Sequence, residues 1–181
     1  MLVTLVSQIP PEGQDVDETF GAADVHAQGE ETFALRPGGS LRCHLEKVDG
    51  QTVHVRGHVG ARLDLECGRC LEPFLLPLEQ ELDLFYQPHQ EDEVEEEDEV
   101  ELTDRDVVVA YYQGDRLDLG EMIREQFFLA VPMKRLCRED CRGRCPSCGA
   151  NRNTQSCGCV QAEEAGDPRL SALKKIFDGS R

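Results

Sequence analysis

Residues 52–67 read TVHVRGHVGARLDLEC, and the expected fold is built around this run. Apolar residues occupy one parity of the run, while charged residues and histidines occupy the other. Such alternation predicts a long, half-buried antiparallel strand. A shorter strand-like run at 41–48 precedes this strand, and Asp49-Gly50 between the two runs fits a tight hairpin turn. On the polar face, His54 and His58 are expected to be exposed to solvent.

The flanking segments extend this pattern in both directions. After Cys67-Gly-Arg-Cys70 the alternation resumes over 74–84, which places the CxxC motif at a turn between two strands. Residues 3–9 alternate weakly and predict an edge strand. The polar stretch 10–39 is weakly patterned, and we expect a loosely ordered connection there.

The strongest helix signal follows a further strand at 107–112. Asp118 and Glu121 have the spacing of a capping box, with Asp118 as the N-cap. Apolar residues then recur at helical spacing over 119–131, which predicts a helix whose stripe packs on the sheet, and Pro132 ends it. A short terminal helix is predicted after Asp167, which precedes a proline.

Composition and charge narrow the class of protein. The chain has 181 residues and a formal net charge of −17, which excludes nonspecific coating of nucleic acid by bulk charge. Eleven acidic residues against Arg105 alone lie within 87–106, where we expect a solvated, mobile insertion. The N-terminus lacks signal-peptide features, and no run reaches the roughly 18 apolar residues of a spanning helix. A cytoplasmic protein with no membrane partner and reduced thiols is therefore expected.

The number of cysteines is also unusual: the chain has nine, and six of them lie within 137–159. Reduced thiols at this spacing are typical of zinc sites, since zinc takes about four soft ligands in a tetrahedron. Cys145-Pro-Ser-Cys148-Gly has the knuckle form, whose short loop aims two sulfurs at one point. Cys43, alone in a strand, is expected to be a buried apolar side chain.

Four arrangements of ligands are open. One zinc is held by Cys145, Cys148, Cys157 and Cys159, or Cys137 or Cys141 replaces one of the last two. Alternatively, the six thiols hold two zincs through bridging sulfurs, or a second site forms from Cys67, Cys70, Cys137 and Cys141. For the pair Cys67 and Cys70, a metal or redox role on one side and a structural role in the turn on the other are equally open.

The surroundings of the cluster favour a structural zinc. No histidine lies between 90 and 181 and no hydrolase or deaminase zinc motif occurs, so a catalytic centre has no general base at hand. Residues 133–159 carry six basic and two acidic residues, a net charge of +4. Their guanidinium groups either contact phosphates or balance the charge of zinc thiolates. Candidate contacts to RNA or a partner are Arg69, Arg142, Arg144 and Arg152.

The order of these motifs resembles the YceD family of large ribosomal RNA subunit accumulation proteins. The resemblance rests on CGRCLEPF at 67–74, the LDL to AVP helix at 117–132, the cysteine segment 137–153 and DPRL at 167–170. Arg144 and Arg152 replace two leucines of the family's second cluster, which makes this loop more basic. The resemblance implies a protein that is not an enzyme and that acts in the accumulation of large-subunit ribosomal RNA.

Together these features predict an α+β fold, with an antiparallel β-sheet packed by one main helix, a C-terminal cysteine-rich zinc loop and a short terminal helix. The expected domains are 1–132, a zinc module at 133–162 and a helical tail at 163–181. The expected function is zinc-bound support of ribosomal RNA synthesis, processing or stability and of ribosome assembly. The expected partners are a ribosomal protein, a pre-ribosomal particle or the RNA. Two alternatives are a CxxC redox or metal-dependent enzyme and a zinc-storage or zinc-sensing protein.

Overall fold

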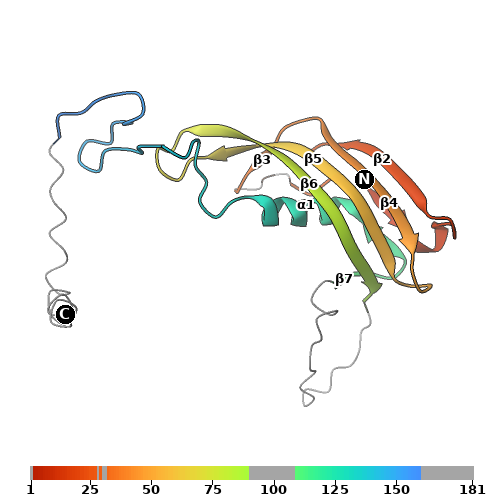
Figure 1. The fold of residues 1–181 in the computed structure, drawn as a ribbon. Helices are drawn as coiled ribbons and strands as arrows, with labels where there is room; N and C mark the ends of the chain where they lie inside the picture. Colours follow the sequence, from red (N-terminus) through yellow and green to blue (C-terminus); the bar gives the residue numbers. More distant parts are fainter. Residues whose placement is uncertain (1, 28, 30–31, 90–108, 160–181) are drawn as a thin grey trace, which may run out of the picture. The chain divides into compact units, whose positions relative to one another are not determined.

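Residues 2–27, 29, 32–89 and 109–159 are described by the structure, a computed structural model. The chain divides into two units, the first comprising Met1–Gly68 and Glu72–Cys137, the second Arg69–Leu71 and the chain from Arg138 onward. Every helix and strand that the structure describes lies in the first unit (Figure 1). The predicted helix after Asp167 and all but the first residues of the acidic insertion lie outside the described residues. The predicted domain boundaries stay predictions.

The centre of the first unit is a long hairpin of β5 (Val53–Glu66) and β6 (Pro73–Pro88). The two strands are antiparallel and stay in register from the pair Val53 and Tyr86 to the pair Glu66 and Pro73. Apolar residues of β5 are fully buried on one face, so the predicted half-buried strand is confirmed. The turn at 67–72 carries the CxxC motif, as predicted.

Neighbouring strands complete a mixed sheet in the order β2-β4-β5-β6-β7, with β3 (Ala34–Leu35) also on β5. The flanking strands are β2 (Gln14–Phe20), β4 (Gly39–Lys47) and β7 (Val109–Tyr112). The expected loose connection over 10–39 is wrong for β2, whose exposed edge position tolerates a polar sequence. The prediction of an antiparallel sheet is also wrong for one strand pair, because β7 pairs parallel to β6. The 20 residues at 89–108 exceed the dozen or so that a parallel connection needs.

One helix, α1 (Leu119–Ala130), covers a single face of this sheet (Figure 1). Asp118, at the end of β8 (Arg116–Asp118), accepts hydrogen bonds from the amides of Gly120 and Glu121 at 2.9 and 3.0 Å, which confirms the predicted N-cap. Strand β8 pairs with β1 (Val3–Leu5), which runs into the 3-10 turn η1 (Val6–Gln8). Within the described residues, no helix has the length and hydropathy needed to cross a membrane.

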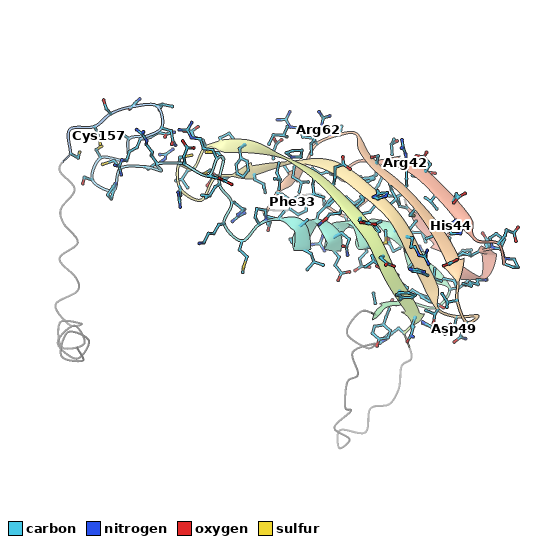
Figure 2. The ribbon with its side chains drawn as sticks, in the orientation of Figure 1. Phe33, Arg42, His44, Asp49, Arg62 and Cys157 are labelled. Carbon is cyan, nitrogen blue, oxygen red and sulfur yellow. The ribbon has the colours of Figure 1, made fainter. Side chains whose placement is uncertain are left out.

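The two faces of the sheet differ in what covers them. On the face toward α1, Cys43 is 6% exposed, and burial raises the pKa of its thiol to about 12. Its prediction as a buried apolar side chain is confirmed. On the opposite face, Arg42 and Arg62 stand away from α1 (Figure 2), and His58 is exposed as expected.

His54 departs from the expected exposure, since it is only 5% exposed. Its ring stacks on Phe85 with the ring centroids 4.1 Å apart. The ring nitrogens lie 3.1 Å from Glu46 Oε1 and 2.6 Å from Asp83 Oδ1. These neighbours come from β4 and β6, so the alternation within β5 does not reveal them.

Phe127 anchors α1 to the core and is fully buried, with the rings of Phe20 and Phe33 at 6.1 and 6.2 Å between centroids. We predict that Phe127→Ala lowers the free energy of unfolding by about 3–5 kcal/mol, because it leaves a cavity. Urea denaturation followed by circular dichroism measures this. Leu129→Ala, on the same helix but 73% exposed, is the control and should stay within about 0.5 kcal/mol of the parent. An equal loss of unfolding free energy in both variants would contradict the assignment of Phe127 to the core.

Candidate metal centres

Eight cysteines gather into two separate groups of four. The first thiol group is Cys67, Cys70, Cys137 and Cys141, and the second thiol group is Cys145, Cys148, Cys157 and Cys159. Within each group all the sulfur atoms lie within 4.8 Å of one another. An ideal zinc tetrahedron with 2.3 Å bonds has sulfur separations of about 3.8 Å. Both groups therefore fit one tetrahedral metal ion each.

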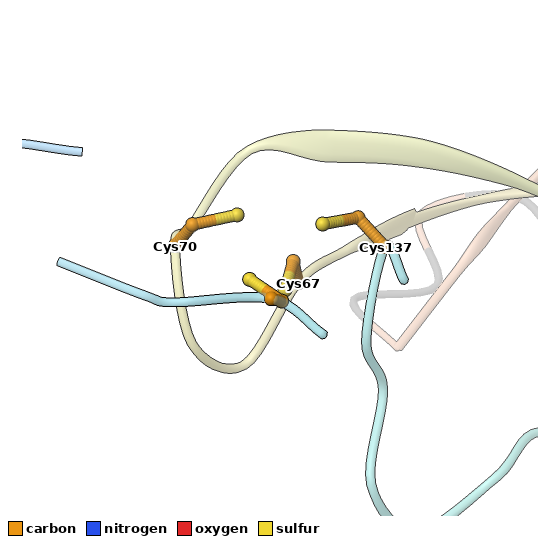
Figure 3. A group of neighbouring side chains, drawn as sticks. Cys67, Cys70 and Cys137 are labelled. Carbon is orange, nitrogen blue, oxygen red and sulfur yellow. The ribbon is translucent and has the colours of Figure 1, made fainter. Parts of the chain in front are cut away.

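The first thiol group is largely closed to solvent. Cys67 and Cys70 are 0% and 1% exposed, Cys141 is 3% exposed, and Cys137 is half-buried. Figure 3 shows the sulfurs of Cys67, Cys70 and Cys137 turned toward a common space. The Cys67 amide donates to the Glu72 carbonyl at 3.0 Å, which closes the turn that carries the CxxC pair. A purely apolar role does not explain four thiols at this spacing, and a soft metal ion does.

The tip of that turn belongs to the second unit and is held there by hydrogen bonds. Arg69 Nη1 donates to the Cys141 carbonyl at 3.0 Å, and Arg144 Nε donates to the Cys70 carbonyl at 2.9 Å. The Arg144 amide also donates to the Arg69 carbonyl at 3.0 Å. Gly143 has a φ of +68°, and a Cβ there would lie 3.0 Å from that same Arg69 oxygen. Guanidinium groups thus fix the backbone that carries two of the thiols.

The second thiol group is built on the knuckle 145–149 and is more open. The Gly149 amide donates to the Cys145 carbonyl at 2.8 Å, and Gly149 adopts a φ of +73°, a left-handed conformation that glycine tolerates. Cys145 is buried, Cys157 is half-buried, and Cys148 and Cys159 are exposed. A metal ion here would be reached by solvent on one side.

The electrostatics of the second thiol group favour a bound cation. The amides of Cys148 and Ser147 donate to the Cys145 thiolate and lower its pKa to about 6. The nearby sulfurs of Cys148 and Cys145 raise the pKa of Cys159 to about 12, and the Cys145 sulfur also raises the pKa of Cys157. Four thiols this close cannot all ionise unless a positive ion compensates their charge.

Asn153 supports a thiol, which the sequence did not reveal because asparagine is also a common turn residue. Its Nδ2 donates to Cys141 Sγ at 3.4 Å and to Asn151 Oδ1 at 3.0 Å. Its Oδ1 accepts from Arg138 Nη2 and from the Arg142 amide, both at 2.8 Å. Donors to a ligating sulfur orient it and stabilise its charge.

The four candidate contact arginines differ in their surroundings. Arg69 and Arg144 donate to backbone carbonyls, as described above. Arg142 and Arg152 line a cavity of about 390 Å³ beside the second thiol group, together with Asn153 and Cys157. Neither makes an ion pair with any residue that the structure describes. The assignment of all four as RNA or partner contacts stays a prediction, and Arg142 and Arg152 are the two best placed for it.

The grouping bears on the four ligand arrangements. The structure brings together the four-thiol set 145, 148, 157 and 159, and also the set 67, 70, 137 and 141. It does not bring Cys137 or Cys141 into the second thiol group, and it does not join six thiols in one cluster. Pairing the CxxC turn with the second cysteine segment requires tertiary structure, and no local signal in the sequence identifies it.

The family model for Large ribosomal RNA subunit accumulation protein YceD matches residues 55–177. The chain belongs to the YceD family. Uncharacterized proteins of Mycobacterium tuberculosis and Mycobacterium bovis are each 36% identical to this YceD-family chain over 153 residues, covering 82% of it and 68% of each relative.

A plant relative matches a shorter part of the chain. It is the chloroplastic Large ribosomal RNA subunit accumulation protein YCED homolog 1 of Zea mays, 37% identical over 62 residues. That match covers 34% of this chain and 20% of the maize protein. No solved structure matches the chain. The resemblance inferred from the motifs is thereby confirmed.

Burial predicts a reactivity order among the thiols. In the full chain as purified, we predict that Cys148 reacts with N-ethylmaleimide at least about tenfold faster than Cys67 and Cys70, because Cys148 is exposed and the latter are buried. Mass spectrometry of timed samples measures the rate at each cysteine, and buried Cys43 is the slow reference. Fast reaction at Cys67 and Cys70 would contradict their burial and favour the redox alternative.

Proposed function

We propose that this YceD-family chain is a non-enzymatic zinc protein that supports the accumulation of large-subunit ribosomal RNA and ribosome assembly in the cytoplasm. The observation that carries the proposal is the family match over 55–177, which contains both thiol groups. The family description and the name of the maize relative both refer to accumulation of this RNA. Accumulation of the RNA is equally consistent with a role in its synthesis, its processing or its stability.

Zinc is the metal that suits the donor set best. Each group offers four sulfur donors, and tetrahedral sites of four thiolates are typical of structural zinc. Cys67, Cys70, Cys137 and Cys141 would hold one ion, and Cys145, Cys148, Cys157 and Cys159 the other. Bound zinc would supply folding free energy to segments that form few other contacts, as in small zinc modules.

The same donor sets argue against catalysis. Four protein ligands fill a tetrahedral ion, so no position is open for water or substrate. A redox role for Cys67 and Cys70 is disfavoured because reactive thiols are partly exposed and these two are buried. Both features support a binding factor.

For the partner, two chemistries are available, and the second unit suits RNA. Arg142 and Arg152 line one cavity together with Asn153 and with Thr154, which supplies a hydroxyl. Guanidinium forks and neutral donors together suit phosphate oxygens. A ribosomal protein or pre-ribosomal particle is the other proposed partner.

Zinc content tests the metal assignment. We expect the full chain to bind two zinc ions, and Cys70→Ser and Cys148→Ser each to bind one, since each removes a ligand from a different group. Elemental analysis of the purified proteins measures the ratio. Cys43→Ser is the matched control and should keep both ions. Loss of both ions from either variant alone would contradict two separate sites.

The same variants extend this test to the function. In a strain that lacks its own copy, the parent chain and Cys43→Ser should restore the ratio of large-subunit to small-subunit ribosomal RNA. Cys70→Ser and Cys148→Ser should restore it less, in proportion to lost zinc. An unchanged ratio in the strain without the gene would contradict the role in accumulation, whatever the zinc content.

RNA contact is tested with paired arginine variants. Arg142→Gln with Arg152→Gln should weaken binding to a single-stranded ribosomal RNA fragment and lower the salt slope by about 1.4, the value for two lost phosphate contacts. Arg42→Gln with Arg62→Gln, on the open face of the sheet, removes the same charge and should leave the slope unchanged. Fluorescence anisotropy over a salt series measures both. Equal effects would contradict the assignment of the cavity.

A further inference from the structure

A second cavity, of about 660 Å³, lies in the first unit where β6, β7 and β8 meet the start of α1. Tyr86 from β6 and Tyr111 from β7 line it, and Glu121 and Glu125 line it from α1. Arg116 of β8 is also in the wall. No cysteine lines this cavity, so neither thiol group uses it.

The carboxylates of this cavity differ in their partners, since Asp118 Oδ2 lies 3.3 Å from His26 Nε2. Glu121 and Glu125 are one helical turn apart, both exposed, and neither forms an ion pair with a residue that the structure describes. Like charges at this spacing repel and weaken a helix. Asp118, the third carboxylate in the wall, is engaged as the N-cap of α1. A cation placed between Glu121 and Glu125 would relieve their repulsion.

Tyr86 points to the same kind of ligand through a separate observation. Most of the residue is buried, with 6% exposed, and its hydroxyl, which is not a buried orphan atom, makes no hydrogen bond to a described residue and is open to the cavity that Tyr86 lines. Burial, with the charges of Glu125 and Glu121, raises the pKa of Tyr86, so the phenol stays neutral. A neutral phenol accepts a hydrogen bond from a cationic donor, and its ring attracts a cation. Tyr111, 60% exposed, offers a second ring at the same cavity.

We propose that this cavity binds a lysine or arginine side chain from a basic segment of a partner protein. Carboxylates beside aromatic rings are the groups that recognise ammonium and guanidinium ions. Phosphates of RNA would be repelled by the same carboxylates. The proposal deepens the protein-partner part of the proposed function but does not depend on zinc.

The sequence around the cavity favours a basic partner further. Strands β6 and β7, which supply the two tyrosines, are joined by the stretch that contains eleven acidic residues and one arginine. Such a charge excess attracts a basic segment over long range and raises its association rate. The cavity would then provide the specific contact.

The test uses the zinc-loaded full chain and a fluorescein-labelled peptide of alternating lysine, arginine and glycine residues, in 150 mM salt. We expect Glu121→Gln with Glu125→Gln to weaken peptide binding at least about tenfold, because two charge-assisted contacts are lost. Glu79→Gln with Glu81→Gln, on the exposed face of β6 away from α1, makes the same charge change and should weaken it less than about threefold. Tyr86→Phe, which keeps the ring, should weaken it about threefold.

Several results would overturn the proposal. One is an equal loss of peptide affinity in the two glutamate double variants, and another is no binding of the peptide at all. A third is equal binding of a peptide whose lysines are acetylated and whose arginines are replaced by citrulline. If Tyr86→Phe binds the peptide with unchanged affinity, the Tyr86 hydroxyl does not contact the basic side chain, and that part of the proposal is wrong. Competition by a single-stranded RNA that depends on Glu121 and Glu125 would show that the occupant is not a basic side chain. Zinc content should be unaffected by all these variants, so failure here is distinguishable from failure of the metal sites.

Discussion

The antiparallel register of β5 with β6 organises the first unit. Fourteen consecutive residue pairs, from Val53 with Tyr86 to Glu66 with Pro73, fix both ends of one hairpin. At one end the register closes the turn that carries the CxxC pair. At the other end it brings Tyr86 under α1, where the acidic and aromatic cavity forms. Two candidate sites of different chemistry are thus positioned by the same ladder of hydrogen bonds.

The features that the sequence predicts correctly are those with local causes. The alternation within β5 requires only that one face be buried, and the N-cap of α1 requires only Asp118 and the amides of the next turn. What it predicts wrongly depends on distant neighbours. Strand β2 exists because an edge of β4 is available to pair with it, and His54 is buried because β4 and β6 supply Glu46, Asp83 and Phe85.

The same distinction separates the two thiol groups. The knuckle around Cys145 and Cys148 is visible in the sequence because its glycine and short spacing form the loop without help from elsewhere. The first thiol group joins a strand turn to a segment about seventy residues later, and the sequence offers that pairing only as one of four arrangements, among which the tertiary structure selects. The hydrogen bonds that Asn153 and Arg144 make at the first thiol group escape sequence reasoning for a related reason, since an asparagine in a turn and an arginine in a basic loop each have an ordinary local explanation.

Net charge alone cannot rank the partners of this chain, because its charges are segregated. A value of −17 disfavours RNA only if the charge is spread evenly. Here Glu121 and Glu125 line a cavity of the first unit, and Arg142 and Arg152 line a cavity of the second. Each cavity presents a field set by its own few groups, since charges beyond about 8 Å are screened at physiological salt. The two proposed partners, a basic protein segment and a phosphate backbone, therefore draw on separate cavities, and neither cavity requires the other to be neutral.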